Sequence, residues 1–453
     1  MRMPKRLSFV SLVLLFSGFL NAAETMDLAS AVSAALAHNY GLKAAEAQVD
    51  AARAGLREAE AQRLPMLSAR SQWTRGDNPV YAFGSLLEQG RFGPDNFAID
   101  SLNHPSDLSN IQSGLDLGIP IFTGYELTTA VRLGELGVQQ ARSGREGELQ
   151  QLRYQASSLY LQIVLDQEIL KRVDERIAAS AQEVADAQKL KERGVVLGSD
   201  YYAAEAILSG LRSWRVQVQT DQATAASRLA IMTGGKDLPV QGTLSEPSYR
   251  IPSRDDLIQQ ALARRPDLLG AASQVSLAEV NRQQAGRSML PKVKAFASLE
   301  TDTNDFSSNP TNHLYGVSAQ LPFGDPGYFS RRSRAASAEE AARQTRANLE
   351  ENVRAEVAQA YEAYQGAFAA QATAKETADH AARSLELFRP LYHSGRQSII
   401  EVLRAEEALA KAQAAYCEVL FRIHSAYLQL SAASGGLDDK IIEMISAQLT
   451  GHP

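Results

Sequence analysis

Two kinds of hydrophobic pattern alternate along this chain. In residues 149–184 and again in residues 349–388, apolar or small side chains recur at alternating steps of three and four, with Asp166 and Ser180 as polar exceptions. A period of 3.5 residues is typical of helices that wrap around one another as coiled coils. The pattern predicts two long helical segments, although a generic solvent-exposed helical bundle fits this period equally well.

Four shorter segments alternate with a period of two. In residues 67–74, 111–119, 293–300 and 315–321, odd positions are mostly apolar or small and even positions mostly polar, with Phe296 as an exception. Side chains alternate faces along a strand, so each segment is predicted to have one apolar and one polar face. Each run is close to the ~9–11 residues that a tilted strand needs to cross a bilayer.

The two patterns recur because the chain is duplicated. Residues 35–65 align without a gap on residues 261–291. A second register pairs Gly194 with Gly395, Asp200 with Glu401, and Glu205 with Glu406. We therefore interpret residues 24–235 and 253–436 as two copies of one unit, with residues 236–252 as a linker and 437–453 as a C-terminal tail.

Segment lengths indicate how the helices are arranged. Residues 125–193 form one helix candidate of about 70 residues, or ~100 Å, and two shorter candidates, 26–64 and 199–233, sum to nearly the same length. Segment 328–392 relates in the same way to 253–290 and 398–433. This predicts a cylinder wall of uniform length with strands at one end. The tip turns 194–198 and 394–397 lie at the other end, and the linker and tail at mid-length. The strand–helix corners are assigned to Pro65, Pro120, Pro291 and Pro322.

The predicted strands require an assembly if they lie in lipid. One chain supplies four, whereas a closed membrane barrel needs about eight or more, because an open edge leaves backbone groups unpaired. At least two copies must then pool their strands. The alternative is a small soluble four-stranded sheet packed on helices.

The N-terminus has the pattern of a signal peptide. Arg2, Lys5 and Arg6 precede an apolar stretch at residues 7–20, and Asn21-Ala22-Ala23 offers a cleavage site. The alternative, a short membrane anchor, is disfavoured by the length of the run. We expect residues 1–23 to be removed. No cysteine lies near the cleavage site, so we expect no lipid anchor there.

Composition narrows the function classes. The 453 residues are 45% hydrophobic and 22% charged with a net charge of −6, too mild to suggest nucleic-acid binding. Cys417 is the single cysteine, so no internal disulfide is possible. The histidines lack metalloprotease spacing, and no GxSxG or phosphate-binding loop is present. We expect no enzyme activity, no metal site and no cofactor.

Residues 76–107 join the first two strands and are long for a hairpin. They contain several apolar side chains, namely Phe83, Leu86, Leu87, Phe92, Phe97 and Ile99. Outer-membrane barrels place long loops outside the cell, so we expect this loop to fold over a pore mouth. Residues 303–312 are its shorter counterpart, and Trp73 and Tyr315 are candidates for an aromatic girdle.

Taken together, the ordered features resemble the TolC-like outer-membrane efflux family (outer membrane factors). The resemblance rests on the duplicated unit, the corner Ile119-Pro120-Ile121-Phe122-Thr123-Gly124, and the tip segments 194–200 and 395–403. It implies a mainly α-helical homotrimer, with a twelve-stranded β-barrel in outer-membrane lipid and a coiled-coil tunnel through the periplasm of a Gram-negative bacterium. It also implies a passive exit duct that docks onto a periplasmic adaptor (membrane fusion) protein fed by an inner-membrane pump. The even-numbered strand positions Arg70, Gln72, Asp116, Lys294 and Glu300 would line the wet interior.

The resemblance further implies a gate at the tip. In similar proteins an acid six residues after the first tip glycine pairs with an aromatic residue before the second, and these positions are Asp200 and Tyr392. The acid ring at the constriction corresponds to Glu401. Arg404 stands where a second acid is expected and Gln397 where a basic residue is common. A simpler interpretation is that Ser199 and Asp200 only cap a helix.

The tip turns are the expected adaptor contacts. One candidate surface comprises Gly194, Leu197, Gly198 and Ser199; the other comprises Gly395, Ser398 and Ile399. Ordinary turn glycines would explain the same pattern without a partner. The competing function classes are a soluble periplasmic coiled-coil adaptor and a structural protein. Two helical hairpins and four strands with matched parity argue against both, and the transported substrate is not indicated.

Overall fold

The computed structural model describes residues 25–235, 239–305 and 310–450, so the expected signal peptide lies outside the described residues. The first repeat contains α1 (Leu28–His38), α2 (Tyr40–Ala61), β1 (Met66–Gly76), α3 (Pro79–Glu88), η1 (Pro94–Phe97), α4 (Ile99–Asn103), β2 (Leu108–Thr123), α5 (Glu126–Glu192) and α6 (Gly198–Met232). The second contains α7 (Arg254–Arg264), α8 (Pro266–Arg287), β3 (Lys292–Thr303), β4 (Thr311–Gln320), α9 (Tyr328–His393) and α10 (Ile399–Ala433), followed by α11 (Asp439–Thr450).

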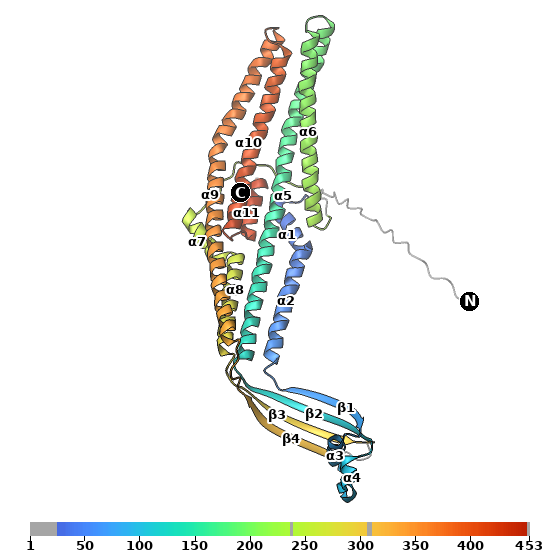
Figure 1. Ribbon diagram of the computed structural model, residues 1–453. Coiled ribbons are helices and arrows are strands. Elements are labelled where there is room, and N and C mark those ends of the chain that lie inside the picture. Colours follow the sequence, from blue (N-terminus) through green and yellow to red (C-terminus); the bar gives the residue numbers. More distant parts are fainter. Residues whose placement is uncertain (1–24, 236–238, 306–309, 451–453) are drawn as a thin grey trace, which may run out of the picture.

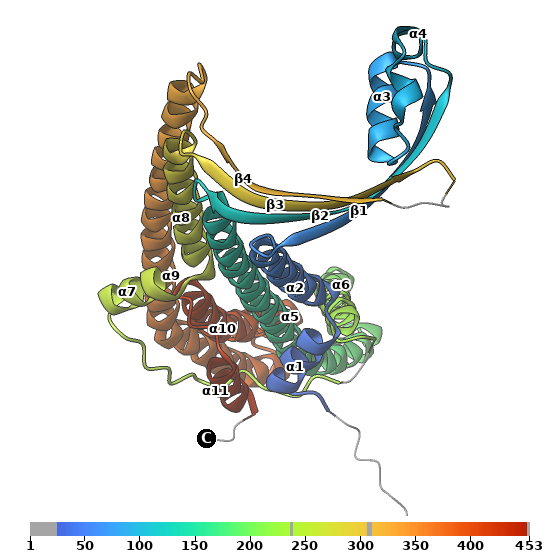
Figure 2. The same cartoon turned by 90° about the horizontal axis from the view of Figure 1, so that it is seen from below.

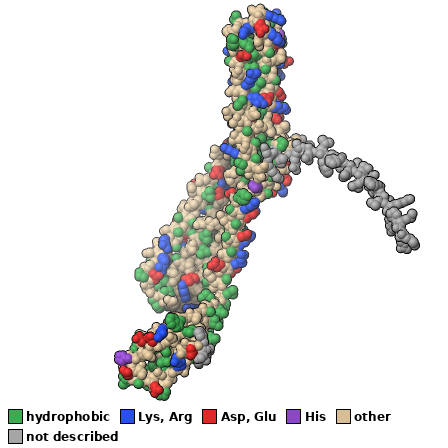
Figure 3. Space-filling model, turned by 90° about the vertical axis from the view of Figure 1, so that its right-hand side faces the viewer, with side chains coloured by type: hydrophobic (Ala, Val, Ile, Leu, Met, Phe, Trp, Pro, Cys, Tyr) green, Lys and Arg blue, Asp and Glu red, His purple; other side chains and the backbone are tan. Residues whose placement is uncertain are grey.

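The molecule is elongated, with the sheet formed by β1, β2, β3 and β4 at one end and the turns that join α5 to α6 and α9 to α10 at the other (Figure 1). The long helix α5 packs against α2 and α6, which lie one above the other, and α9 packs in the same way against α8 and α10. Two short helices therefore match one long helix, as their lengths predict. Among the described helices, we find none long and apolar enough to cross a bilayer. On the face shown in Figure 3, charged side chains of both signs are interspersed along the helical part.

The helices expected at 26–64 and 253–290 are each interrupted once, which corrects our prediction of unbroken segments. The breaks fall at Asn39 and Arg265, which are equivalent in the two repeats; both residues are extended, with ψ of 124° and 127°. Arg265 precedes Pro266, which disfavours helical backbone before it. Asn39 instead caps the next helix, accepting a hydrogen bond from Leu42 N at 2.8 Å.

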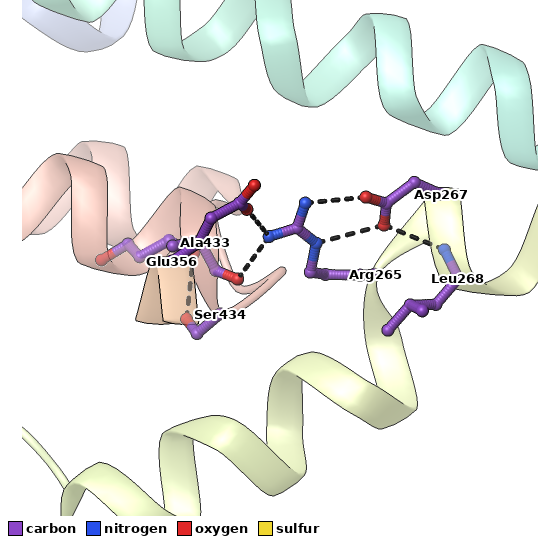
Figure 4. A network of polar contacts seen from close by, with 7 residues as sticks. Arg265, Asp267, Leu268, Glu356, Ala433 and Ser434 are labelled. Atoms are coloured by element: carbon purple, nitrogen blue, oxygen red, sulfur yellow. Dashed lines mark hydrogen bonds and ion pairs between the residues drawn. The ribbon is translucent and has the colours of Figure 1, made fainter. Parts of the chain in front are cut away.

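The second break is tied to the rest of the second repeat by the Arg265 guanidinium. It donates to Asp267 Oδ2 at 2.7 Å, to Glu356 Oε2 on α9 at 2.5 Å, and to the carbonyl of Ala433, the last residue of α10 (Figure 4). The final carbonyls of a helix lack intrahelical partners. Arg265 therefore satisfies one of them and joins three helices at mid-length.

The strands form one antiparallel sheet in the order β1-β2-β3-β4. Its register places Leu67 beside Leu117, Leu117 beside Ala297, and Ala297 beside Tyr315. The odd-numbered apolar positions thus share one face (the apolar face), while Arg70, Gln72, Gln112, Glu300 and Asp302 share the other (the polar face). The exception, Phe296, lies on the polar face, where its ring covers Gly316 of β4.

Three of the corner prolines flank strand ends, but Pro120 does not end its strand. β1 begins after Pro65, β3 begins after Pro291, and Pro322 follows β4. β2 continues to Thr123 with a bulge: the pairing passes from Pro120–Lys294 to Phe122–Val293 and leaves Ile121 unpaired. Proline lacks an N–H group, so a bulge accommodates it within a central strand.

The linker and tail pack around the middle of the helices. Met26 forms a parallel bridge with Val240, and Thr243 N donates to Leu449 O of α11 at 2.9 Å. The buried His424 of α10 bonds to Tyr249 of the linker, with Nδ1 and Oη 2.6 Å apart. The main hydrophobic core lies at this level, and a second core lies near the tip.

Candidate functional site: the helical tip

Both tip turns have the same backbone geometry. Gly194 and Gly395 have φ of +75° and +72°, a region that favours glycine. At each turn, the N–H of the residue after the glycine reaches back to a helix carbonyl: Val195 to Leu190 and Arg396 to Leu391, both at 2.9 Å. These are Schellman motifs that close α5 and α9. The turn interpretation therefore accounts for both glycines.

The candidate adaptor residues differ in exposure. Gly194, Leu197, Gly198, Ser199 and Gly395 are exposed, and Ser398 is half-buried. Ser398 caps α10 by accepting a hydrogen bond from Ile400 N at 3.2 Å. Ile399 is only 1% exposed and packs in the tip core, so the structure does not present it for contact. This corrects its inclusion in the second candidate surface.

Asp200 lies in the first turn of α6 and faces the second hairpin. Its Oδ2 accepts from Ser398 Oγ and its Oδ1 from Ser199 Oγ, both at 3.3 Å. The N-cap residue of α6 is Leu197, with no side-chain cap, so Asp200 is not the cap that the simpler interpretation supposed. Its charge is still favourable near the positive end of the helix dipole. Asp200 thus joins the start of α6 to the start of α10.

Tyr392 is buried in the tip core and is not hydrogen-bonded to Asp200 within this chain. It is 8% exposed, and its hydroxyl has no hydrogen-bond partner in the part of the chain that the structure describes. Burial first, and then the negative charges of Glu183 and Asp186, raise the pKa of Tyr392. A buried hydroxyl without a partner costs free energy.

Glu401 and Arg404 pair with each other on the exposed side of α10, where Arg404 Nη1 lies 3.2 Å from Glu401 Oε1. Their side chains are 40% and 66% exposed. Exposed pairs one helical turn apart contribute only ~0.3–0.5 kcal/mol.

The most deeply buried charge of the tip region is one that our sequence analysis did not single out. Glu406 on α10 is fully buried and accepts from Arg176 Nη1 of α5 at 3.2 Å and from Arg389 Nη2 of α9. Glu183 of α5 lies 3.9 Å from Arg389, and burial raises the pKa of Glu183. This network (Arg176, Glu183, Arg389 and Glu406) connects the two hairpins.

A signal for Glu406 was present in the sequence. It stands within an apolar run of α10 that includes Leu403, Ala405, Leu409 and Ala410, all of them buried. A lone acid on such a stripe predicts a buried partner, because an unpaired buried charge is costly. Its equivalent in the first repeat, Glu205, is exposed and accepts from Tyr201 Oη at 2.9 Å.

Comparison with known proteins agrees with this architecture. The family model described as outer membrane efflux protein matches residues 31–235 and 257–436. The nickel-cobalt-cadmium resistance protein NccC of Alcaligenes xylosoxydans xylosoxydans is 26% identical over 221 residues, 48% of this chain and half of NccC. The outer membrane efflux protein BepC of Brucella suis is 23% identical over 333 residues, 71% of each chain.

A solved structure shows the same fold over nearly the whole length. The Campylobacter jejuni CmeC outer membrane channel superposes with a TM-score of 0.77 at 16% identity, covering 99% of this chain and 98% of CmeC. The family match covers most of the described residues, including both hairpins and all four strands. The chain therefore belongs to the outer membrane efflux protein family.

Proposed function

We propose that this chain forms the outer-membrane exit duct of a tripartite efflux or type I secretion system. The observation that carries the proposal is the separation of the two faces of the sheet. Leu67, Trp73, Tyr315 and Val317 are 66–77% exposed on the apolar face, while charged and amide side chains occupy the polar face. An exposed apolar band of this kind suits lipid, and the opposite face suits a water-filled pore.

The sheet also supports pooling of strands. β1 and β4 are its edges, with no further strand paired to either within the described residues. Unpaired edges are not tolerated in lipid. Three copies would supply twelve strands and close the barrel, with β4 of one copy beside β1 of the next. The helices of three copies would continue it as a periplasmic tunnel.

The polar face is organised by Arg70. Its Nη1 donates to Asp116 Oδ2 at 2.8 Å, and its Nη2 donates to Glu300 two strands away. To reach Glu300, the Arg70 side chain crosses Gly114 of β2, where an added Cβ would lie 3.5 Å from Arg70 Nε. The guanidinium therefore lies over Gly114, at van der Waals distance from the point where a Cβ would stand. Such a charged wall fits a duct for hydrated cargo.

The tip is the proposed gate. Asp200, Tyr392, Glu401 and Arg404 remain its candidate residues, and the Asp200–Ser398 contact and the Glu406 network hold the hairpins together in this chain. Hydrogen bonds to charged groups contribute only ~1.5–3 kcal/mol each. A periplasmic adaptor that binds Gly194, Leu197, Gly198, Ser199, Gly395 and Ser398 could therefore supply enough binding free energy to separate them. An inner-membrane pump would drive transport.

We further propose that residues 1–23 direct export and are then cleaved, without lipidation, so that the protein reaches the outer membrane of a Gram-negative bacterium. Mass spectrometry of the mature protein checks this directly. The expected mass corresponds to a chain beginning near Glu24 with no attached lipid. Retention of residues 1–23, or an added acyl mass, contradicts it.

The conduit proposal is tested by fluorescence, since the chain has only two tryptophans, Trp73 and Trp214. In a Trp214→Phe variant, Trp73 is the sole reporter, and lipids brominated on their acyl chains should quench it strongly. A Trp73→Phe variant, which retains Trp214 on α6, is the control and should be quenched little. Equal quenching of the two variants, or a soluble monomer that does not insert into vesicles, would overturn the proposal.

Transport itself is tested by deleting the gene and restoring it. Because NccC is named for nickel, cobalt and cadmium resistance, these metals are compared with a lipophilic dye as cargo. The deletion should raise intracellular accumulation of at least one of them, and the intact gene should reverse it. Unchanged accumulation of all four would argue against a role in their efflux.

A further inference from the structure

The long loop between the first two strands is anchored to the polar face of the sheet. Gln89, just after α3, donates through Nε2 to Asn110 Oδ1 and to Ser109 O, both at 2.9 Å. Tyr81 of α3 lies with its hydroxyl 2.9 Å from Thr74 Oγ1. Thr74 and Asn110 are paired in the register and share the polar face. Helix α3 therefore covers that face at the end of the sheet far from the helices (Figure 2).

Three carboxylates meet where α3 ends. Glu88 is the last residue of α3, and Glu300 and Asp302 lie on the polar face of β3. One carboxylate oxygen from each residue lies within 4.8 Å of the other two. Burial first, and then the charges of Asp302 and Glu300, raise the pKa of Glu88. Three acids at this separation repel one another unless a positive charge lies between them.

Asp302 gives a second, independent reason to expect a ligand. It is fully buried, and its Oδ1 accepts a hydrogen bond from Asn110 Nδ2 at 2.6 Å. Its Oδ2 is buried and has no hydrogen-bond partner among the described residues. A buried anionic oxygen without a partner is among the more costly arrangements in a protein.

Arg70, the cation bonded to Glu300 of this cluster, does not fill this role. Arg70 binds Glu300, but it also binds Asp116 on the other side. Gln112 donates through Nε2 to Glu300 Oε1 at 2.6 Å, which orients that carboxylate without adding charge. When ionised, the four carboxylates of Glu88, Asp116, Glu300 and Asp302 carry three more charges than Arg70, the one guanidinium that bonds to Asp116 and Glu300.

We propose that Glu88, Glu300 and Asp302 bind a divalent cation of the Ca²⁺ type, which fastens α3 and its loop to the polar face of the sheet. Ca²⁺ takes carboxylate oxygens at ~2.3–2.6 Å and accepts irregular coordination. Two of its ligand oxygens can therefore lie up to ~5 Å apart, and the three oxygens here all lie within 4.8 Å of one another. Mg²⁺ demands shorter, near-octahedral coordination, and the absence of histidine or cysteine from the cluster disfavours Zn²⁺. Water would complete the shell.

This site does not depend on the conduit proposal, because one chain supplies all three carboxylates. Its consequence is structural: the loop at the outer end of the sheet is held down when the cation is bound and released when it is removed. Extracellular calcium modules bind at ~10⁻⁴–10⁻³ M. We therefore expect the loop to respond to millimolar Ca²⁺.

The experiment uses the full-length protein purified in detergent and treated with a chelator. Ca²⁺ is titrated by calorimetry, and cleavage of the loop by a protease is followed with and without about 2 mM Ca²⁺, which exceeds the upper end of the ~10⁻⁴–10⁻³ M range. The wild type should bind about one Ca²⁺ per chain, and cleavage between residues 77 and 107 should slow several-fold. Mg²⁺ should bind at least ~tenfold more weakly.

Two variants decide the assignment. Glu88→Gln should weaken Ca²⁺ binding ~tenfold or more, because ligand charge sets affinity, and should abolish the protection of the loop. Asp100→Asn removes an exposed acid of α4 in the same loop, outside the cluster, and should behave as the wild type. The proposal is overturned by the absence of saturable binding, by equal responses to Ca²⁺ and Mg²⁺, or by Glu88→Gln matching Asp100→Asn.

Discussion

Glu406 of α10 and Arg176 of α5 form an ion pair at 3.2 Å between the two helical hairpins, and the carboxylate of Glu406 is completely buried. The same carboxylate accepts from Arg389 of α9. One acid thus connects three of the four helices that lead to the tip. At the equivalent position of the first repeat, Glu205 of α6 is exposed and lies outside this network. The duplicated hairpins have therefore taken on different roles at equivalent positions.

Glu406→Gln should loosen the tip. The substitution keeps the side-chain volume but removes the charge that Arg176 and Arg389 share, and leaves them only Glu175 and Glu183, each at 3.9 Å. Breaking a buried pair costs ~3–5 kcal/mol, and we expect the lower end because Arg389 is 39% exposed. Single-channel conductance in a planar bilayer should rise, and the apparent Tm should fall. Glu205→Gln is the matched control and should change neither; equal effects of the two variants would refute the role of the network.

The gate is tested by Asp200→Ala combined with Tyr392→Phe. Loss of Asp200 removes its contact with Ser398, so the double variant should conduct more than the wild type at low voltage. Tyr392→Phe alone should alter stability little, because the hydroxyl it removes bonds to none of the described residues. If Tyr392→Phe alone opens the channel, its hydroxyl bonds to a neighbouring copy. Unchanged conductance of the double variant would refute the gate role of Asp200 and Tyr392.

Leu197→Asp should weaken docking of the adaptor without disturbing assembly. Leu197 is 69% exposed beside Gly198 at the first tip turn, so a charge there costs the fold little. The introduced carboxylate would, however, be buried without a partner when an apolar adaptor surface covers the tip turn. Efflux should fall several-fold while the amount of oligomer in the outer membrane stays constant. Val195→Asp provides the control, since Val195 is 70% exposed but is not among the proposed contacts.

Stability should fall in mild acid because of His424. Burial lowers the pKa of His424 from 6.5 to about 4. Between these values the unfolded chain binds a proton that the folded chain excludes. The stabilisation is therefore complete above about pH 6.5 and is lost as the pH falls towards 4, amounting to ~3 kcal/mol. The neighbouring Tyr249 and Tyr427 do not titrate in this range.

The measurement is the difference in apparent Tm between pH 7.5 and pH 4.5. This difference in Tm should be large for the wild type and much smaller for His424→Gln, because glutamine cannot take up the proton. Glutamine also retains an amide that can donate to Ser245 O, which lies 3.3 Å from His424 Nε2 in the wild type. A variant with the wild-type pH dependence would show that other groups cause the loss.

Much of the architecture could be read from local patterns. The change from a period of 3.5 to a period of two marks the helices and strands, and the parity of the strands correctly assigns their two faces, because side-chain direction along an element depends only on its own geometry. Gly194 and Gly395 mark the tip turns for the same local reason. The break at Arg265 also had a local signal in Pro266, which we did not use.

What the sequence determined by itself was therefore the order and amphipathic character of the long helices and the strands. Tertiary structure alone decided which polar groups meet: Glu406 with Arg176, Asp200 with Ser398, and Glu88 with Glu300 and Asp302. It also decided that Ile399 and Tyr392 are buried at the tip. The physical reason is that these contacts depend on the orientation of each helix about its own axis and on how a loop folds back across a sheet. Periodicity records only the direction of each side chain along its own element.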